Sequence, residues 1–350
     1  MNNVRLTQYS HGAGCGCKIS PGLLHEILSD AIAYPDNKHL LVGNHSKDDA
    51  AVYDIGNGQC LISTTDFFMP IVDDPFQFGQ IASANAISDV YAMGGKPILA
   101  IAILGWPIQT LPASVAKEVI SGARDICGKA GIKLAGGHSI DAPEPIFGLA
   151  VNGLVHRSAI KQNNTARIGD YLFLTKKIGV GLLATAEKKG VLLKEDFDVA
   201  ANQMVRLNSF GNLIAHHASV HAMTDVTGFG LMGHLLEMVD GAQVSATLQF
   251  EHIPLLSKNV HHYIKEGCIP GGTRRNYDSY GAHMTIDNTL DWASTMAILC
   301  DPQTSGGLLI SVGGDGLTSL KNALHSAGLD EFIHPIGRIT EEPKGRVRVQ

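Results

Sequence analysis

Apolar and polar residues alternate along the chain with periods that predict both strands and helices. Residues 50–55 and 60–65 have the pattern of short strands, and Gly56-Asn57-Gly58 between them is a turn sequence, so the three together predict a β-hairpin. Apolar runs predict further strands over residues 97–104 and 146–155. Helices are predicted over residues 21–33, 76–93 and 113–130.

The second half of the chain continues this mixture after a polar stretch. Strands are predicted over residues 171–175, 221–226, 244–250, 306–312 and 333–339. Helices are predicted over residues 179–189, 197–218, 231–240, 258–266 and 315–327. Hairpins mixed with strand–helix pairs favour an α+β fold over a strictly alternating parallel sheet. The polar stretch, residues 156–169, is the predicted linker, so we expect a mobile glycine-rich segment over residues 1–20 and domains over residues 21–156 and 170–350.

Composition and charge exclude several classes of function. Of the 350 residues, 45% are hydrophobic and 17% are charged, which is typical of a well-buried globular protein with room for two domains. The net charge of −6, without a basic run, argues against a nucleic-acid partner. No apolar span reaches the roughly 18 residues of a membrane helix, and residues 1–18 lack the apolar core of a signal peptide. We therefore expect a cytoplasmic protein without a membrane partner.

Six cysteines occupy positions 15, 17, 60, 127, 268 and 300, and we expect them to be reduced. Cys15 and Cys17 stand apart, because they lie in the glycine-rich run His11-Gly12-Ala13-Gly14-Cys15-Gly16-Cys17-Lys18. A nearby ammonium group and exposed backbone amides lower the pKa of a thiol and make its thiolate more available. The run is not a phosphate-binding P-loop, and no second Cys/His pair with zinc-finger spacing completes a zinc site. It is either a reactive segment or a flexible terminus that holds two thiols.

Aspartates at the ends of predicted elements form a second candidate group: Asp48, Asp49, Asp66, Asp89 and Asp225. Asn85 and Asp89 are four positions apart on a predicted helix and therefore share a face. Asp48 and Asp49, in an extended segment, point to opposite sides, one toward a metal ion and the other toward a nucleotide hydroxyl or a lysine. Carboxylates suit Mg²⁺, which binds a few of them together with substrate phosphates. Taken singly, each aspartate is better explained as a cap or turn residue.

Two glycine-rich motifs offer further sites. Gly136-Gly137-His138-Ser139 can present backbone amides to an anion, while His138 either contacts phosphate or satisfies a turn carbonyl. Gly228-Phe229-Gly230-Leu231-Met232-Gly233 matches G-x-G-x-x-G, follows a predicted strand and opens a predicted helix. The acid expected at the end of the next strand is not clear, because Glu251 lies in a polar stretch. The context is therefore against a nicotinamide cofactor.

Taken together and in order, these motifs resemble those of the selenophosphate synthetase family over nearly the whole chain. The matching segments are residues 10–18, 63–68, 85–95, 134–140, 224–230, 270–273 and 301–307. The resemblance implies a PurM-like fold of two α+β domains with mixed sheets, in a homodimer whose N-terminal domains pair strands across the interface. It also implies the conversion of ATP, selenide and water to selenophosphate, AMP and phosphate, with Mg²⁺ as cofactor.

The resemblance implies a role at each matching position. Cys15 looks like the family's essential cysteine, and Lys18 resembles the lysine required for catalysis near the ATP phosphates. The implied nucleotide contacts are Lys18, Ser46, Lys47, Asp48, Asp66, Asp89, Gly137, His138 and Ser139. The implied magnesium ligands are Asp49, Asp89 and Asp225. One departure is Ser46-Lys47 where many relatives read Thr-Arg, because lysine cannot reproduce the bidentate fork of a guanidinium.

Two rival functions stay open. Another PurM-like enzyme, such as a thiamine-phosphate kinase or an aminoimidazole ribonucleotide synthetase, would share the fold and the ATP site but would not account for residues 15–18. A non-catalytic thiol-based carrier of selenium or a metal would use the two cysteines alone and would not require the five dispersed aspartates.

Overall fold

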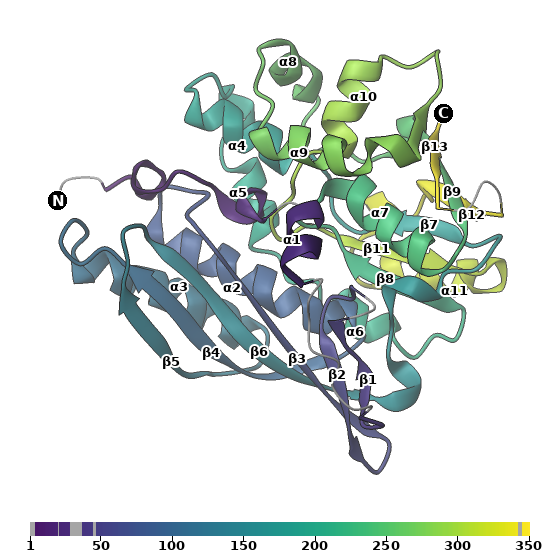
Figure 1. Cartoon of the computed structure of the whole chain (residues 1–350), viewed down its shortest axis with the longest axis horizontal. Helices are drawn as coiled ribbons and strands as arrows, with labels where there is room; N and C mark the ends of the chain where they lie inside the picture. The colour runs from purple at the N-terminus through teal and green to yellow at the C-terminus, as the bar shows by residue number, and fades with distance from the viewer. Residues whose placement is uncertain (1–3, 20, 29–36, 45–46, 342–344) are drawn as a thin grey trace.

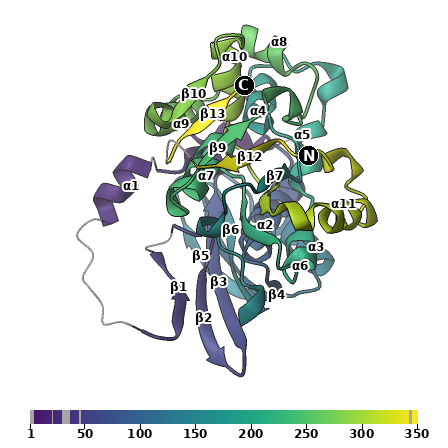
Figure 2. The same ribbon diagram turned by 90° about the vertical axis from the view of Figure 1, so that its right-hand side faces the viewer.

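The computed structural model describes residues 4–19, 21–28, 37–44, 47–341 and 345–350. In these residues the chain forms two units of mixed strands and helices that pack side by side, each around its own sheet (Figure 1). Two 3-10 helices, η1 Leu6–Tyr9 and η2 Gly14–Cys17, and the helix α1 Pro21–Leu28 precede the first sheet. Figure 2 shows α1 projecting from the side of the molecule. Across the described ranges, none of the helices combines the length and the apolar character that a membrane span requires.

The first sheet has six strands in the order β1-β2-β3-β6-β4-β5. They are β1 Leu40–Val42, β2 Ala51–Gly56, β3 Gln59–Phe68, β4 Lys96–Trp106, β5 Leu134–Asp141 and β6 Ile146–His156. Neighbours pair antiparallel except β4 and β5, which are parallel. The predicted hairpin is confirmed by β2 and β3. Gly56, Asn57 and Gly58 all have positive φ in its turn, a backbone conformation that glycine and asparagine adopt at low cost.

Helix α2, Pro75–Ala92, lies between the two units and positions much of the site. Asp74 caps it by accepting the Gln77 N–H (2.7 Å), with Pro75 at the first helical position. The helix packs on β3 and β6 and also contacts the second sheet. Every residue from Ile81 to Ala92 is buried, so this stretch is apolar or small on all sides. Helix α3, Ala113–Lys129, packs beside it on the same face of the first sheet (Figure 1).

The second sheet has seven strands in the order β10-β13-β9-β12-β7-β11-β8. They are β7 Tyr171–Leu174, β8 Val220–Asp225, β9 Ser245–Leu248, β10 Met284–Ile286, β11 Leu308–Val312, β12 Gly337–Thr340 and β13 Val347–Val349. The helices of this unit are α4 Val180–Lys188, α5 Val199–Met204, α6 Phe210–Ile214, α7 Gly230–Gly241, α8 Val260–Lys265, α9 Gly271–Tyr280, α10 Trp292–Leu299 and α11 Leu317–Ser326. The α+β architecture expected from the sequence is confirmed.

Several sequence predictions differ from the structure. The single helix over residues 197–218 is wrong, because α5 and α6 are separated where the Asn208 amide donates to Ser88 Oγ (2.7 Å) and to the Gly306 carbonyl (2.8 Å). This long-range anchor overrides the local helical pattern. The helix predicted over residues 21–33 is observed as α1, and its last five positions lie outside the described residues. The strands β1, β5, β10 and β13 and the helices α9 and α10 were not predicted.

Candidate active site

The glycine-rich segment around Cys15 lies against both units of the chain. Gly14 donates its N–H to the Met69 carbonyl (3.0 Å), and Cys15 donates its N–H to Thr304 Oγ1 (3.0 Å). Gly14 has a φ of +51°, and a Cβ there would lie 2.4 Å from Thr304 Oγ1. Only glycine therefore allows this close approach. In the resulting position, Cys15 is only 1% exposed.

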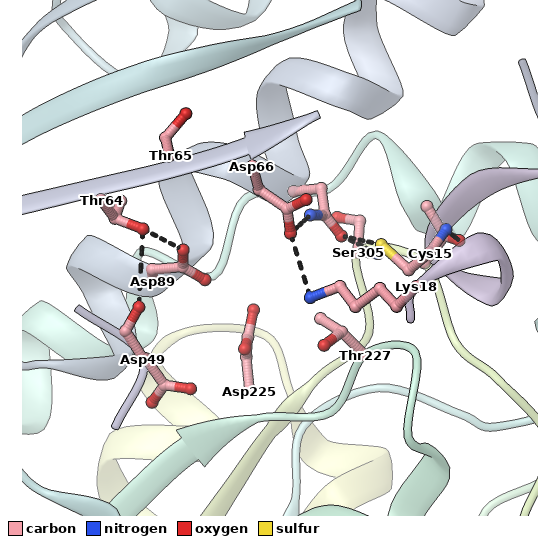
Figure 3. Close-up of polar contacts among 12 residues, drawn as sticks. Cys15, Lys18, Asp49, Thr64, Thr65, Asp66, Asp89, Asp225, Thr227 and Ser305 are labelled. Atoms are coloured by element: carbon pink, nitrogen blue, oxygen red, sulfur yellow. Dashed lines mark hydrogen bonds and ion pairs between the residues drawn. The ribbon is translucent and has the colours of Figure 1, made fainter. Parts of the chain in front are cut away.

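The thiol of Cys15 points toward Asn85 on α2 (Figure 3). Its Sγ–H donates to Asn85 Oδ1 (3.3 Å), which also accepts the Ser305 N–H (2.7 Å). The Asn85 amide nitrogen donates to Asp66 Oδ2 (2.7 Å). Because a backbone N–H must donate and a carboxylate must accept, the amide has one orientation, with its oxygen toward the thiol.

Lys18 reaches Asp66 from the other end of the same segment. Its Nζ lies 3.5 Å from Asp66 Oδ2 and 6.0 Å from the centre of the Phe229 ring. The charge of Asp66 raises the pKa of Lys18, so the lysine stays protonated. One amide and one carboxylate therefore join the thiol of Cys15 to the ammonium group of Lys18 (Figure 3).

Three further aspartates line the space beside Asp66: Asp49 before β2, Asp89 on α2 and Asp225 at the end of β8 (Figure 3). Thr64 donates its hydroxyl to Asp89 Oδ2, and Thr224 donates to Asp49 Oδ1 (2.8 Å). The Oδ2 atoms of Asp49 and Asp225 are buried and have no hydrogen-bond partner in the described part of the chain. Buried polar atoms of this kind need a partner.

The three carboxylates also repel one another. Burial, followed by the charge of Asp225, raises the pKa of Asp49 and of Asp89 well above the ordinary range. Burial raises the pKa of Asp225 to about 6. A cation would satisfy the bare oxygens and offset the repulsion, so the donor set fits Mg²⁺. Among residues with described positions, no three acidic, His or Cys side chains converge as a finished metal site, which suits an ion that also binds phosphate and water.

Asp48 points away from the aspartate group, as predicted for neighbours in an extended segment. Its Oδ1 accepts the N–H groups of Asn163 (3.2 Å) and Asp49 (3.2 Å), and burial raises its pKa to about 7. Lys47 has a φ of +50°, and its carbonyl accepts from Asn163 Nδ2 (3.0 Å). Ser46, a predicted nucleotide contact, lies outside the described residues.

The structure does not bring Gly137, His138 and Ser139 to the aspartates of the same chain. They are exposed on β5, the edge strand, whereas Asp66 lies on β3, three strand positions away. At the usual spacing between strands, the separation is on the order of 14 Å. A Cβ at Gly137 would lie 2.3 Å from the Ala102 carbonyl oxygen, so glycine permits the parallel pairing of β5 with β4.

The G-x-G-x-x-G motif packs the N-terminal segment instead of opening a dinucleotide fold. Its strand, β8, is an edge strand that pairs antiparallel with β11, so the motif does not begin a parallel β–α–β unit. A Cβ at Gly228 would lie 2.4 Å from the Cys15 carbonyl oxygen. The first glycine of the motif therefore allows the reactive segment to pass closely over the loop.

Several residues of the site were missed in the sequence: Thr64, Thr224, Arg275, Asn276, Thr304 and Ser305. The sequence offers one signal for some of them, a polar run between apolar segments at residues 301–307. That loop is held rigidly, because Gln303 Oε1 accepts the N–H groups of Gly179 and Val180 (both 3.2 Å) at the start of α4.

Comparison with known proteins identifies the fold. The family models for the N-terminal and C-terminal domains of AIR synthase related proteins match residues 47–155 and 167–350. The structure of thiamine-monophosphate kinase from Stenotrophomonas maltophilia is similar, with a TM-score of 0.64 at 20% identity over 90% of this chain and 92% of that one. The hydrogenase maturation protein HypE in complex with ATP gives a TM-score of 0.62 at 18% identity over 99% and 94%. The fold is PurM-like, as the resemblance implied.

Curated relatives are closer in sequence. The protein named selenide, water dikinase from Aeromonas hydrophila subsp. hydrophila is 61% identical over 340 residues, covering 97% of this chain and 96% of the relative. The protein of the same name from Photorhabdus laumondii subsp. laumondii is 57% identical over 347 residues, covering 99% and 98%. By this identity and coverage, the chain belongs to the selenide, water dikinase family.

Proposed function

We propose that this protein is an ATP-dependent phosphotransferase that converts ATP, selenide and water to selenophosphate, AMP and phosphate. The observation that carries the proposal is the buried thiol of Cys15, which one network joins to Asp66 and Lys18 beside the aspartate group. Relatives at 57–61% identity over nearly the whole chain are named for this reaction. A kinase that acts on selenide needs a phosphate-binding centre and a selenium-binding group side by side.

The aspartate group is the proposed place for the triphosphate. Asp49, Asp89 and Asp225 would hold Mg²⁺, since their buried carboxylates include two oxygens without a described partner. A bound Mg²⁺ supplies charge neutralisation to the triphosphate. Lys18 brings a further positive charge from the N-terminal segment, where its raised pKa keeps it protonated.

In the proposed first step, hydrogen selenide attacks the γ-phosphorus of ATP. A selenium–phosphorus bond forms, the bond to the bridging oxygen breaks, and ADP leaves with the electron pair. Phosphoryl transfer depends mainly on alignment and charge neutralisation. Cys15 positions the selenium, and the seated segment excludes water, because Cys15 is almost fully buried. Water then attacks the β-phosphorus of ADP, which gives AMP and phosphate.

We also infer that two copies of the chain form the working enzyme. The face of the first sheet opposite α2 exposes Phe67 (49%), Ile101 (42%) and Ile140 (59%), and β5 leaves a free edge beside them. An apolar face next to an unpaired strand edge suits a symmetric interface. A second copy packed there would supply the partner's Gly137, His138 and Ser139 to the nucleotide, which explains why these residues lie away from Asp66 within one chain.

The other proposed nucleotide contacts are Ser46, Lys47, Asp48, Asp66 and Asp89. Lys47 and Asp48 are held in place by Asn163, at the junction between the two units. Lys47 would meet phosphate as a point charge, without the fork of an arginine. A cytoplasmic location fits the free thiols of Cys60, Cys127 and Cys268.

The rival functions explain fewer of the contacts. A thiamine-phosphate kinase shares the fold, but it gives no reason for Cys15 to join the network of Asp66 and Lys18. A thiol-based carrier gives no reason for three buried aspartates around one space. Both observations follow when the thiol and the phosphate site serve one reaction.

The test is an anaerobic incubation with ATP, Mg²⁺ and selenide, followed by phosphorus NMR and nucleotide chromatography. We expect selenide-dependent AMP together with a species that contains a selenium–phosphorus bond. A parallel incubation with thiamine monophosphate in place of selenide should give no product. ADP as the final product, or turnover with thiamine monophosphate, would contradict the proposal.

A further inference from the structure

A small cavity lies beside the reactive segment. Its lining includes Cys15, Lys18, Gly228, Gly272 and Arg275. Its volume of about 10 Å³ is that of a space for a single water molecule. The side chain of Lys18 is 39% exposed, so solvent reaches the segment next to the buried thiol.

Glycines determine how narrow this cavity is. A Cβ at Gly228 would lie 2.4 Å from the Cys15 carbonyl oxygen, and a Cβ at Gly272 would lie 3.4 Å from the Gly16 carbonyl oxygen and 3.0 Å from a Pro302 side-chain carbon. The segment thus packs against two backbones without side chains between them. A molecule that passes here can have about one heavy atom, since the cavity holds about one water.

Arg275 and Lys18 give the cavity its charge. Arg275 lies on α9, is exposed, and donates from Nη2 to the Gly16 carbonyl (2.6 Å). A guanidinium has five N–H groups, so most of them stay available. Arg275 forms no ion pair with any residue whose position is described, whereas its neighbour Arg274 pairs with Asp278 (2.8 Å). The lining contains no carboxylate among the described residues, so a small anion meets two cations and no opposing charge.

We propose that this cavity is the entrance for hydrogen selenide and that Arg275 selects its monoanion there. The inference rests on the proposed function and adds to it the route and the recognition of one substrate. Hydrogen selenide has one heavy atom and carries a single negative charge near neutral pH, which matches the size and the charge of the cavity. The weakly hydrated guanidinium of Arg275 suits a large, polarisable anion better than a lysine would. Arg275 is a positioning residue for this substrate.

The kinetic test compares Arg275→Ala and Arg275→Lys with Arg274→Ala, a matched control that removes the same charge one residue away. For Arg275→Ala we expect kcat/KM for selenide to fall by roughly tenfold or more, with kcat at saturating selenide and KM for ATP nearly unchanged. Raising the salt should lower kcat/KM for selenide in the unmodified enzyme and much less in Arg275→Ala. Arg275→Lys should recover part of the loss, and Arg274→Ala should behave as the unmodified protein.

A purely structural role for Arg275 would look different. If its only task were to hold the Gly16 carbonyl, Arg275→Ala would lower kcat at saturating selenide or raise KM for ATP, and the salt dependence would not change. Either result overturns the proposal, as does an Arg275→Ala variant that matches Arg274→Ala. Thermal unfolding of each variant shows that the comparison is made between folded proteins.

A second measurement does not depend on turnover. Crystals soaked in sodium bromide should show an anomalous peak between Arg275 and the Gly16 segment, present in Arg274→Ala and absent in Arg275→Ala. A missing peak, or one that persists in Arg275→Ala, overturns the entrance site even if the enzyme makes selenophosphate. A peak in a protein that makes no selenophosphate would instead leave the anion site standing and contradict the proposed function.

Discussion

At the residue scale, Asn85 joins the thiol and the phosphate sides of the site. Its amide accepts from Cys15 and from the Ser305 N–H, and it donates to Asp66. All three contacts use the orientation of an amide, which neither a carboxylate nor an apolar side chain can reproduce.

Replacing Asn85 by Asp keeps the shape and reverses one contact. The new carboxylate would face Asp66, 2.7 Å from the present amide nitrogen, so the two acids would repel. We expect a loss of activity of about 100-fold and a free energy of unfolding lower by about 1–3 kcal/mol. Selenophosphate assays and urea unfolding measure the two effects. Asn37→Asp, at an exposed position, is the control, and activity within about threefold of the unmodified protein in Asn85→Asp would contradict this role.

Lys176 leads to a prediction about pH. Its Nζ donates to the carbonyls of Arg206 (2.7 Å) and Ser305 (2.7 Å), and burial lowers its pKa from 10.5 to about 7. Between these values the unfolded chain binds a proton that the folded protein does not. The free energy of unfolding therefore rises with pH in this window, by up to about 1.4 kcal/mol per pH unit from this group.

Lys176→Met should remove that contribution. Denaturant unfolding at several pH values between 7 and about 10 should show a shallower rise for the variant. Lys188→Met, at an exposed position of α4, should keep the slope of the unmodified protein. Parallel curves for Lys176→Met and the unmodified protein would show that Lys176 keeps its ordinary pKa in the fold.

At the element scale, the loop between β8 and α7 is shaped for the N-terminal segment. Gly228 faces the Cys15 carbonyl, and the Gly228 carbonyl accepts from Asn276 Nδ2 (2.9 Å) on α9. The loop therefore has little freedom to move away from an added side chain. The position of Cys15 depends on this close approach as much as on its own hydrogen bonds.

Gly228→Ala tests this dependence. The added methyl group would lie 2.4 Å from the Cys15 oxygen, so the segment could not seat, and we expect activity to fall by about 100-fold with the fold retained. Gly128→Ala is the control, because nothing lies within 4 Å of a Cβ there, and it should stabilise α3 by about 0.5–1 kcal/mol. Full activity in Gly228→Ala would mean that catalysis does not use the seated segment.

The sequence predicted what depends on local geometry and missed what depends on long-range contacts. The four-residue spacing of Asn85 and Asp89 placed both on the site-facing side of α2, and the adjacency of Asp48 and Asp49 predicted their opposite directions. Thr304 lies 289 positions from Cys15, and no local pattern reveals that contact. The same applies to Asn208, whose bonds to Ser88 and Gly306 break the predicted helix.

At the scale of the whole molecule, the first sheet presents an apolar face and an open edge on the side away from α2 (Figure 1). The proposed nucleotide contacts on β5 lie at this edge. Assembly and nucleotide binding are therefore coupled in our proposal, because the partner's His138 and Ser139 complete the site.

Ile140→Glu tests the coupling. Ile140 is 59% exposed on β5, and a charge buried there would oppose assembly. We expect a monomer by analytical ultracentrifugation and ATP binding weakened by about tenfold or more. Ile168→Glu, at a residue that is 58% exposed outside the sheet, should stay dimeric and bind ATP normally. A dimer that persists in Ile140→Glu would place the interface elsewhere.

The most direct test of the whole account follows selenophosphate formation in the unmodified protein and in Cys15→Ser, with Cys17→Ser as the control. The thiol of Cys15 is the group that links the selenium side to Asp66 and Lys18. We predict selenide-dependent AMP and a selenium–phosphorus product in the unmodified protein, none in Cys15→Ser and a milder loss in Cys17→Ser. Equal loss in both variants would indicate a paired-thiol mechanism, and full activity of Cys15→Ser would contradict the central role given to this cysteine.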